Sequence, residues 1–261
     1  MVKASKFASD LKDIAKNHKT VYAWGMFGSQ ITRYTVTLKA GQYPSWYTDS
    51  KINTVFSPLY GASPPVWGFD CIGLIKGVLW GWHGDPSATS YGGARYASNG
   101  VPDISADSMI SRCYDVSTDF DSVAVGEFLW MKGHCGIYIG NGLAVESTPS
   151  WKNGVQITAC NRYKLGFKSR YWTKHGKLPY IEYDGGEVKD TVTIELSVLR
   201  KGSKGEQVKT LQRLLNAFGS NLSVDGDFGS KTDSALRSFQ KAKGLSVDGI
   251  CGKNSWTSLL K

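Results

Sequence analysis

The 261-residue sequence has no run of 18 apolar residues, which excludes a membrane-spanning helix. Residues 1–19 predict a surface helix and lack the apolar core of a secretory signal, so no export signal is visible. Cysteines number only five, an odd count without the close spacing of a zinc knuckle or a redox motif. A disulfide framework is therefore not expected, and the sequence predicts neither a metal site nor a cofactor.

Acidic residues are too few to balance the basic ones. The chain has 22 Asp and Glu against 31 Lys and Arg, a formal net charge of +9 that is spread over both of its parts. Such a charge suits an anionic polymer, whether nucleic acid, a membrane surface or the bacterial wall. Charge alone does not choose among them. The 41% of hydrophobic residues and 20% of charged residues are typical of a globular protein.

The chain changes character near residue 184, which divides it into two parts. Residues 1–186 predict an α+β domain, because a helix is followed by short strands separated by Gly and Asn turns, the pattern of an antiparallel meander. Residues 29–66 and 83–121 lack lasting periodicity and are expected to be long loops. Such loops are often functional, as lids or cleft walls, but the sequence does not give the role of these two. We expect strands at residues 125–131, 134–140, 143–148 and 154–159. Residues 187–261 predict a small all-α domain of three helices, joined through a linker at about 184–195.

One predicted helix, at residues 71–82, places a cysteine where it can react. Its apolar residues recur on one face, and Asp70 is a favourable N-cap that puts Cys71 in the first turn. A thiol there lies among unpaired backbone N–H groups at the positive end of the helix dipole, which lowers its pKa. Cys71 is therefore a candidate nucleophile. From this segment alone, a small buried core cysteine fits equally well.

A cysteine nucleophile needs a general base and a group that orients this base. His134 is the best candidate base, because it opens a strand in an otherwise apolar run. Glu146 becomes its diagonal neighbour on the same face if residues 140–142 form a three-residue loop. A two-residue turn would instead place Glu146 on the opposite face, and Gln156 would then be the first candidate for the orienting group.

Three segments carry a resemblance to a known family. They read Trp-Gly-Phe-Asp-Cys-Ile-Gly-Leu at 67–74, Val-Gly-Glu-Phe-Leu-Trp at 125–130 and Gly-His-Cys-Gly-Ile-Tyr-Ile-Gly-Asn-Gly at 133–142. Together they resemble the NlpC-type family of papain-like cell-wall cysteine peptidases. The resemblance implies a papain-like helix packed on an antiparallel sheet, with Cys71 as nucleophile, His134 as base and Glu146 as third catalytic residue.

A fourth segment, Tyr-Ala-Trp-Gly at 22–25, is similar to a motif that closely precedes the cysteine in that family, although a long insertion separates the two here. The resemblance implies that Tyr22 points its hydroxyl at the catalytic centre. We further expect Trp24, Trp67 and Asp70, which lie in the matching segments, to bind substrate.

Two residues depart from the family pattern. Glu146 stands where His, Asn or Gln is usual, and its charge would favour an imidazolium and hence a thiolate–imidazolium pair. Cys135 stands where an aliphatic residue is usual. Strand alternation places it on the face opposite His134, so we expect it to pack in the core.

The C-terminal part contains an internal repeat. Residues 222–236 and 245–259 each begin Leu-Ser-Val-Asp-Gly and continue through a second glycine into a helix start. Residues 199–260 resemble the three-helix peptidoglycan-binding domain of wall hydrolases, which implies wall contacts by Asp225, Phe228, Asp248 and Trp256. A packed helical module without a ligand is the alternative. Nucleic acid is not expected, because the glycine-turn repeats carry no cluster of arginines.

A wall hydrolase joined to a wall anchor, without a visible signal peptide, resembles a bacteriophage endolysin. We expect it to remain in the host cytoplasm until lysis and then to act on the cell wall, where it binds peptidoglycan and does not insert into the membrane. The sequence does not give the oligomeric state, for which a monomer is the default. The resemblance implies cleavage between D-glutamate and the diamino acid of the peptide stem. The alternatives are an N-acetylmuramoyl-L-alanine amidase, a host autolysin and an inactive wall-binding protein.

Overall fold

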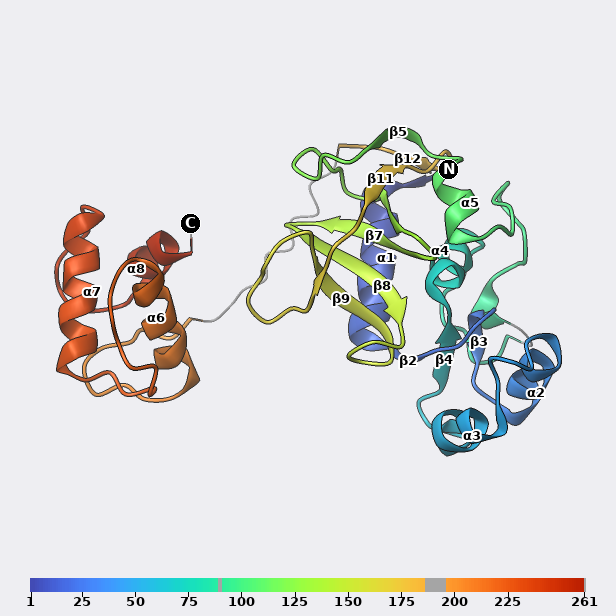
Figure 1. Cartoon of the computed structure of the whole chain (residues 1–261), viewed down its shortest axis with the longest axis horizontal. Helices are drawn as coiled ribbons and strands as arrows, with labels where there is room; N and C mark the ends of the chain where they lie inside the picture. Colours follow the sequence, from blue (N-terminus) through green and yellow to red (C-terminus); the bar gives the residue numbers. More distant parts are fainter. Residues whose placement is uncertain (89–90, 186–195, 261) are drawn as a thin grey trace. The chain divides into compact units, whose positions relative to one another are not determined.

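The computed structural model describes residues 1–88, 91–185 and 196–260, which form two compact units, residues 1–189 and 190–261 (Figure 1). Most of the linker expected at about 184–195 lies outside the described residues. Within the described ranges, no helix is both long and apolar enough to cross a membrane.

The first unit is built on a seven-stranded sheet with the order β10-β9-β8-β7-β6-β11-β5. Its centre is the predicted antiparallel meander, which is confirmed, with each strand pairing with the next along the chain. The strands are β5 (Tyr114–Ser117), β6 (Phe128–Met131), β7 (His134–Gly140), β8 (Leu143–Thr148), β9 (Gly154–Cys160), β10 (Ser169–Arg170) and β11 (Lys174–Lys177).

Two helices cover one face of this sheet. Helix α1 (Ala4–Asn17) buries Phe7, Leu11 and Ile14, which recur with helical spacing, and Figure 1 shows it lying along β8 and β9. Helix α4 (Cys71–Leu79) lies in the same hydrophobic core and begins at Cys71, as the sequence predicts. It ends at Leu79, three residues before the expected position, because the chain turns at Trp80 and Gly81.

Residues 29–66 are a correction to the expected loop. The segment leaves a three-stranded sheet of β2 (Lys19–Tyr22), β4 (Val66–Phe69) and β3 (Phe27–Gln30), and forms helices α2 (Arg33–Gln42) and α3 (Asp49–Lys51). A π-helical turn (Ile52–Phe56) and a 3-10 turn (Ser57–Leu59) follow. This insertion packs Val36, Tyr47 and Phe56 in a core that it shares with Val21 of β2 and with Ala23 and Met26. The sequence did not predict its helices, because their apolar residues do not recur along a single helical face.

The second expected loop, residues 83–121, also contains regular structure in its described part. It forms a short 3-10 turn (Tyr91–Gly93), helix α5 (Ala106–Ile110) and strand β5. A small two-stranded parallel sheet pairs β1 (Val2–Lys3) with β12 (Ile181–Glu182) near the end of the first unit. The α+β class is therefore confirmed, with more elements than the sequence indicated.

The second unit forms the three predicted helices, α6 (Glu206–Ala217), α7 (Ser230–Ala242) and α8 (Lys253–Leu259). The two repeats lead into α7 and α8 as expected. A buried glutamine holds each Asp-Gly turn: the Gly226 N–H donates to Gln212 at 3.0 Å, and the Gly249 N–H donates to Gln240 at 3.0 Å. The two glutamine side chains in turn donate to Asp225 and Asp248 at 2.8 Å.

Candidate active site

The start of helix α4 is fixed by the side chain that precedes it. Asp70 accepts a hydrogen bond from the Gly73 N–H at 2.5 Å, the N-cap arrangement that the sequence predicts. Its other oxygen accepts from the Gly25 N–H at 2.7 Å. Asp70 therefore ties the segment that carries Tyr22 and Trp24 to the residue that precedes Cys71.

His134 and Glu146 lie in direct contact. The Nε2 atom of His134 is 2.7 Å from a carboxylate oxygen of Glu146. Strands β7 and β8 pair Ile137 with Val145 and Tyr138 with Ala144, which is the register expected for the wider loop. The imidazole also stacks on Trp172, with ring centroids 5.5 Å apart and planes inclined by 10°. Carboxylate and indole together hold the ring in one orientation.

Glu146 is fully buried and has a second cationic partner that sequence reasoning missed. Arg170, on β10, donates from Nη2 to Glu146 at 2.8 Å and from Nε at 3.0 Å, and the Thr158 hydroxyl donates at 2.7 Å. Burial alone would raise the pKa of Glu146, but the hydrogen bonds from His134 and Arg170 hold this pKa below its usual value. The carboxylate therefore stays ionised between two cations.

The surroundings of Cys71 favour its thiolate. A hydrogen bond from the Cys135 thiol is the largest cause, and it acts with His134 and the Ile72 N–H against the effect of burial to lower the pKa of Cys71 to about 5. Burial also acts against the imidazolium, but Cys71 and Glu146 raise the pKa of His134 to about 9. At a pH between these two pKa values, Cys71 is a thiolate and His134 is an imidazolium, so a thiolate–imidazolium pair is the favoured state.

Cys135 has a larger part in this site than the sequence indicates. It is fully buried in the core beneath α4, as expected, but its thiol also faces the Cys71 sulfur. Burial, followed by this interaction with Cys71, raises the pKa of Cys135 well above its usual value. Cys135 is therefore a neutral S–H donor to its neighbour.

Tyr22 lies beside the same sulfur. Burial and the neighbouring charge of Cys71 raise the pKa of Tyr22 far above its usual value, so the phenol keeps its proton and can donate it in a hydrogen bond. Burial and the charge of Cys71 likewise raise the pKa of Asp70 to about 7. The structure thus brings Cys71, His134, Glu146 and Tyr22 together.

A cleft of about 830 Å³ opens above Cys71. The insertion supplies one wall through Lys39, Gln42 and Tyr43, and the segment from Tyr91 to Asp107 supplies another. Two of the three residues expected to contact substrate, Trp24 and Asp70, line this cleft. The expectation for Trp67 is corrected, because its side chain is only 3% exposed and packs edge-to-face on Trp82 in the core.

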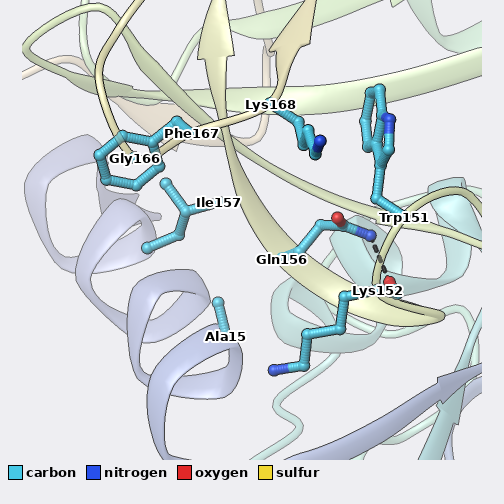
Figure 2. A pocket seen from close by; sticks show the side chains of 8 residues that line it. All are labelled: Ala15, Trp151, Lys152, Gln156, Ile157, Gly166, Phe167 and Lys168. Atoms are coloured by element: carbon cyan, nitrogen blue, oxygen red, sulfur yellow. Dashed lines mark hydrogen bonds between the residues drawn. The ribbon is translucent and has the colours of Figure 1, made fainter. Parts of the chain in front are cut away.

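A second hollow, of about 600 Å³, lies between α1 and β9 (Figure 2). Gln156 is among its lining side chains, and Figure 2 shows the Gln156 amide turned toward Lys152, where it donates to the main-chain carbonyl. Gln156 also donates to the Ser150 carbonyl at 3.0 Å. It therefore shapes the loop that carries Trp151, while Glu146 is the residue that contacts His134. Within the described ranges, no group of three or more His, Cys, Asp or Glu side chains is placed to hold a metal ion.

Of the four residues expected to contact the wall, two are buried in the core of the second unit and two lie at its Asp-Gly turns. Phe228 and Trp256 are 0% and 2% exposed and form part of its core, so burial corrects the expectation that they contact the wall directly. Asp225 and Asp248 brace the two Asp-Gly turns. Asp248 additionally lines a small pocket of about 190 Å³ with Ser246 and Asn254.

Comparisons with known proteins place the second unit in a family. Residues 204–259 match the family model described as a putative peptidoglycan binding domain. The zinc D-Ala-D-Ala carboxypeptidase of Streptomyces albus G is 39% identical over 64 residues, which are 23% of this chain and 25% of that protein. The N-acetylmuramoyl-L-alanine amidase CwlL of Bacillus licheniformis is 42% identical over 59 residues, 22% of this chain and 16% of that one.

A solved structure shows a similarly limited match. The endolysin of the Burkholderia AP3 phage is 43% identical, with 24% of each chain covered and a TM-score of 0.24. The chain thus spans a quarter or less of the length of these three relatives. A peptidoglycan-binding segment shared with wall-lytic proteins is what the comparisons establish.

Proposed function

We propose that the protein is a peptidoglycan hydrolase in which Cys71 attacks an amide bond of the peptide stem. The observation that carries the proposal is the contact of His134 with buried Glu146 beside a cysteine at a helix N-terminus, on the floor of a cleft. A nucleophile, a base and an orienting group are the parts that cysteine catalysis requires.

The reaction runs in two stages. The Cys71 thiolate adds to the carbonyl carbon, and His134 then gives its proton to the leaving amine as the C–N bond breaks and a thioester forms. The neutral imidazole next removes a proton from water, whose oxygen attacks the thioester. This attack releases the acid and the Cys71 thiolate, which restores the thiolate–imidazolium pair. The Cys71 backbone N–H and the Tyr22 hydroxyl stabilise the oxyanion in both stages. Glu146 holds the imidazole and stabilises its charged form.

The bond we propose joins D-glutamate to the diamino acid of the stem, as implied by the NlpC-type resemblance. A second candidate is the bond between muramic acid and L-alanine, because a relative over the second unit is named as an amidase of that bond. The second unit would act as the anchor that holds the enzyme on peptidoglycan. An endolysin is the role we propose, and a host wall-remodelling enzyme or an inactive wall-binding protein are the alternatives.

The test replaces the nucleophile. Cys71→Ala and Cys71→Ser should abolish lysis of purified walls while wall binding persists, because the matched peptidoglycan-binding segment lies in the second unit. Cys113→Ser, which changes a half-buried thiol outside the cleft, is the matched control and should retain lysis. Lysis at the wild-type rate by both Cys71 variants would exclude the proposed mechanism. Mass spectrometry of the released fragments identifies the bond from its new termini.

A further inference from the structure

The charged side chains that line the cleft differ in how fully they are paired with other groups of the protein. Three acidic side chains lie there, and each is already held by two donors of the protein itself. Asp70 accepts from the N–H groups of Gly25 and Gly73, Asp103 from Lys76 and Tyr96, and Asp107 from Trp130 and the Gly133 N–H. None of these three carboxylates is therefore free to bind a cationic ligand.

Lys39 is the exception among the charged groups of the cleft that the structure describes. Its Nζ atom donates to a neutral acceptor, the Gln42 amide oxygen, at 2.9 Å, and it forms no ion pair with the described carboxylates. Lys76, the other lysine lining the cleft, is paired with Asp103. Burial lowers the pKa of Lys39, with Asp70 and Asp103 acting in the opposite direction. The Tyr43 ring is its other close partner, with the Nζ atom of Lys39 5.7 Å from the ring centroid. A half-buried ammonium held only by an amide and an aromatic ring would be stabilised by an anionic ligand.

The position of Lys39 is set by folded structure rather than by a mobile loop. It lies in the last turn of α2, whose first turn is capped reciprocally by Thr32 and Thr35. The helix is anchored through Val36 in the core that the insertion shares with Val21 and Met26. The aromatic side chains of Tyr91 and Tyr96 line the same cleft. Lys39 is thus held in the lining of the cavity that contains Cys71.

We propose that Lys39 binds a carboxylate of the substrate close to the scissile amide, and so selects stem peptides whose glutamyl residue keeps its free α-carboxylate. This inference rests on the proposed function. A glutamyl residue joined through its side-chain carbonyl retains the α-carboxylate a few bonds from the carbon that Cys71 attacks. Walls in which that group is amidated present a neutral carboxamide instead, which forms no ion pair with Lys39.

The experiment compares two synthetic tripeptides, L-Ala-γ-D-Glu-L-Lys and its α-carboxamide counterpart, with the full chain as enzyme. The wild type should cleave the carboxylate peptide with a kcat/KM about 10- to 100-fold higher, the range of a charge-assisted hydrogen bond. Lys39→Met should remove that preference by slowing only the carboxylate peptide. Lys39→Arg should keep most of it. Arg33→Met, an exposed cation on the same helix outside the cleft, is the matched control and should behave as wild type.

The outcomes separate the two proposals. Equal cleavage of both peptides by the wild type, or an undiminished preference in Lys39→Met, would overturn the assignment of Lys39 and leave the hydrolase proposal standing. Cleavage of neither peptide by the wild type would overturn the proposed bond and the inference with it. A lower KM for the carboxylate peptide that is lost in Lys39→Met identifies the effect as substrate binding.

Discussion

At the scale of single residues, the carboxylate of Glu146 is shared between His134 and Arg170, and this sharing decides what its removal would do. Glu146→Gln keeps a hydrogen-bond acceptor but leaves the Arg170 charge uncompensated beside the imidazole. The loss of the carboxylate charge and the uncompensated Arg170 charge both disfavour the imidazolium. The pKa of His134, which is about 9 in the wild type, should therefore fall. The pH window in which the thiolate–imidazolium pair exists should therefore narrow from its alkaline side.

The rate should fall by about ten- to a thousandfold in Glu146→Gln, less than after loss of the nucleophile. The measurement is the pH dependence of kcat/KM on a soluble wall peptide, in which the alkaline limb should move to lower pH. Glu182→Gln, an exposed change on β12, serves as the control. An unchanged rate and an unchanged alkaline limb would show that Glu146 has no part in orienting or charging His134.

The role of an individual residue could be predicted where it depends on residues that are close in the sequence. Asp70 precedes a helix and Cys71 opens it, so both assignments followed from neighbouring residues. Arg170 could not be found in this way, because it lies 24 positions from Glu146 on a strand of only two residues. The donor role of Cys135 was missed for a similar reason. Strand alternation gives the face on which a residue lies but not which side chain of another element it meets.

At the scale of elements, helix α4 depends on its close approach to the backbone next to β3. A Cβ atom added at Gly73 would lie 2.1 Å from the Met26 carbonyl oxygen, and one at Gly77 would lie 2.4 Å from the Phe27 carbonyl oxygen. Neither backbone group can rotate away as a flexible side chain would. The two glycines therefore let the helix that carries Cys71 lie directly on the segment that follows Tyr22.

Gly73→Ala should lower the free energy of unfolding of the first unit by about 1–3 kcal/mol, the usual cost of forcing an extra carbon into a packed site. Urea denaturation followed by near-ultraviolet circular dichroism measures this change. Gly41→Ala is the matched control, since that helical glycine is exposed and has no atom within 4 Å of an added Cβ. The close-approach explanation fails if the two substitutions have equal effects.

Regular periodicity explains which elements were predictable. The meander and helices α1, α4, α6 and α7 show clear alternation or a helical stripe, because each packs one face on a common core. The insertion was expected to be a loop because α2 buries only Val36, and its remaining contacts come from residues such as Tyr47 and Phe56 outside that helix. A core assembled from scattered side chains leaves no repeating pattern in the sequence.

At the scale of the whole molecule, the two units have separate hydrophobic cores. Residues 190–261 expressed alone should therefore fold and sediment with purified peptidoglycan, while residues 1–186 should keep cleavage of soluble wall peptides. Pelleting with walls and a peptide-cleavage assay measure the two activities. A folded C-terminal piece that stays in the supernatant would contradict the anchor assignment, and an inactive but folded N-terminal piece would contradict the separation of functions.

The ends of the insertion lie side by side. The Ile31 N–H donates to the Val66 carbonyl at 2.8 Å, and Gln30 pairs with Trp67 across antiparallel strands β3 and β4. Residues 32–65 therefore leave and re-enter the sheet at one place, and their buried side chains pack in one core with Val21, Ala23 and Met26. An exchange of residues 32–65 that keeps the side chains packed on Val21, Ala23 and Met26 would therefore give the cleft a new wall and a different substrate preference, while Cys71 and His134 keep their positions.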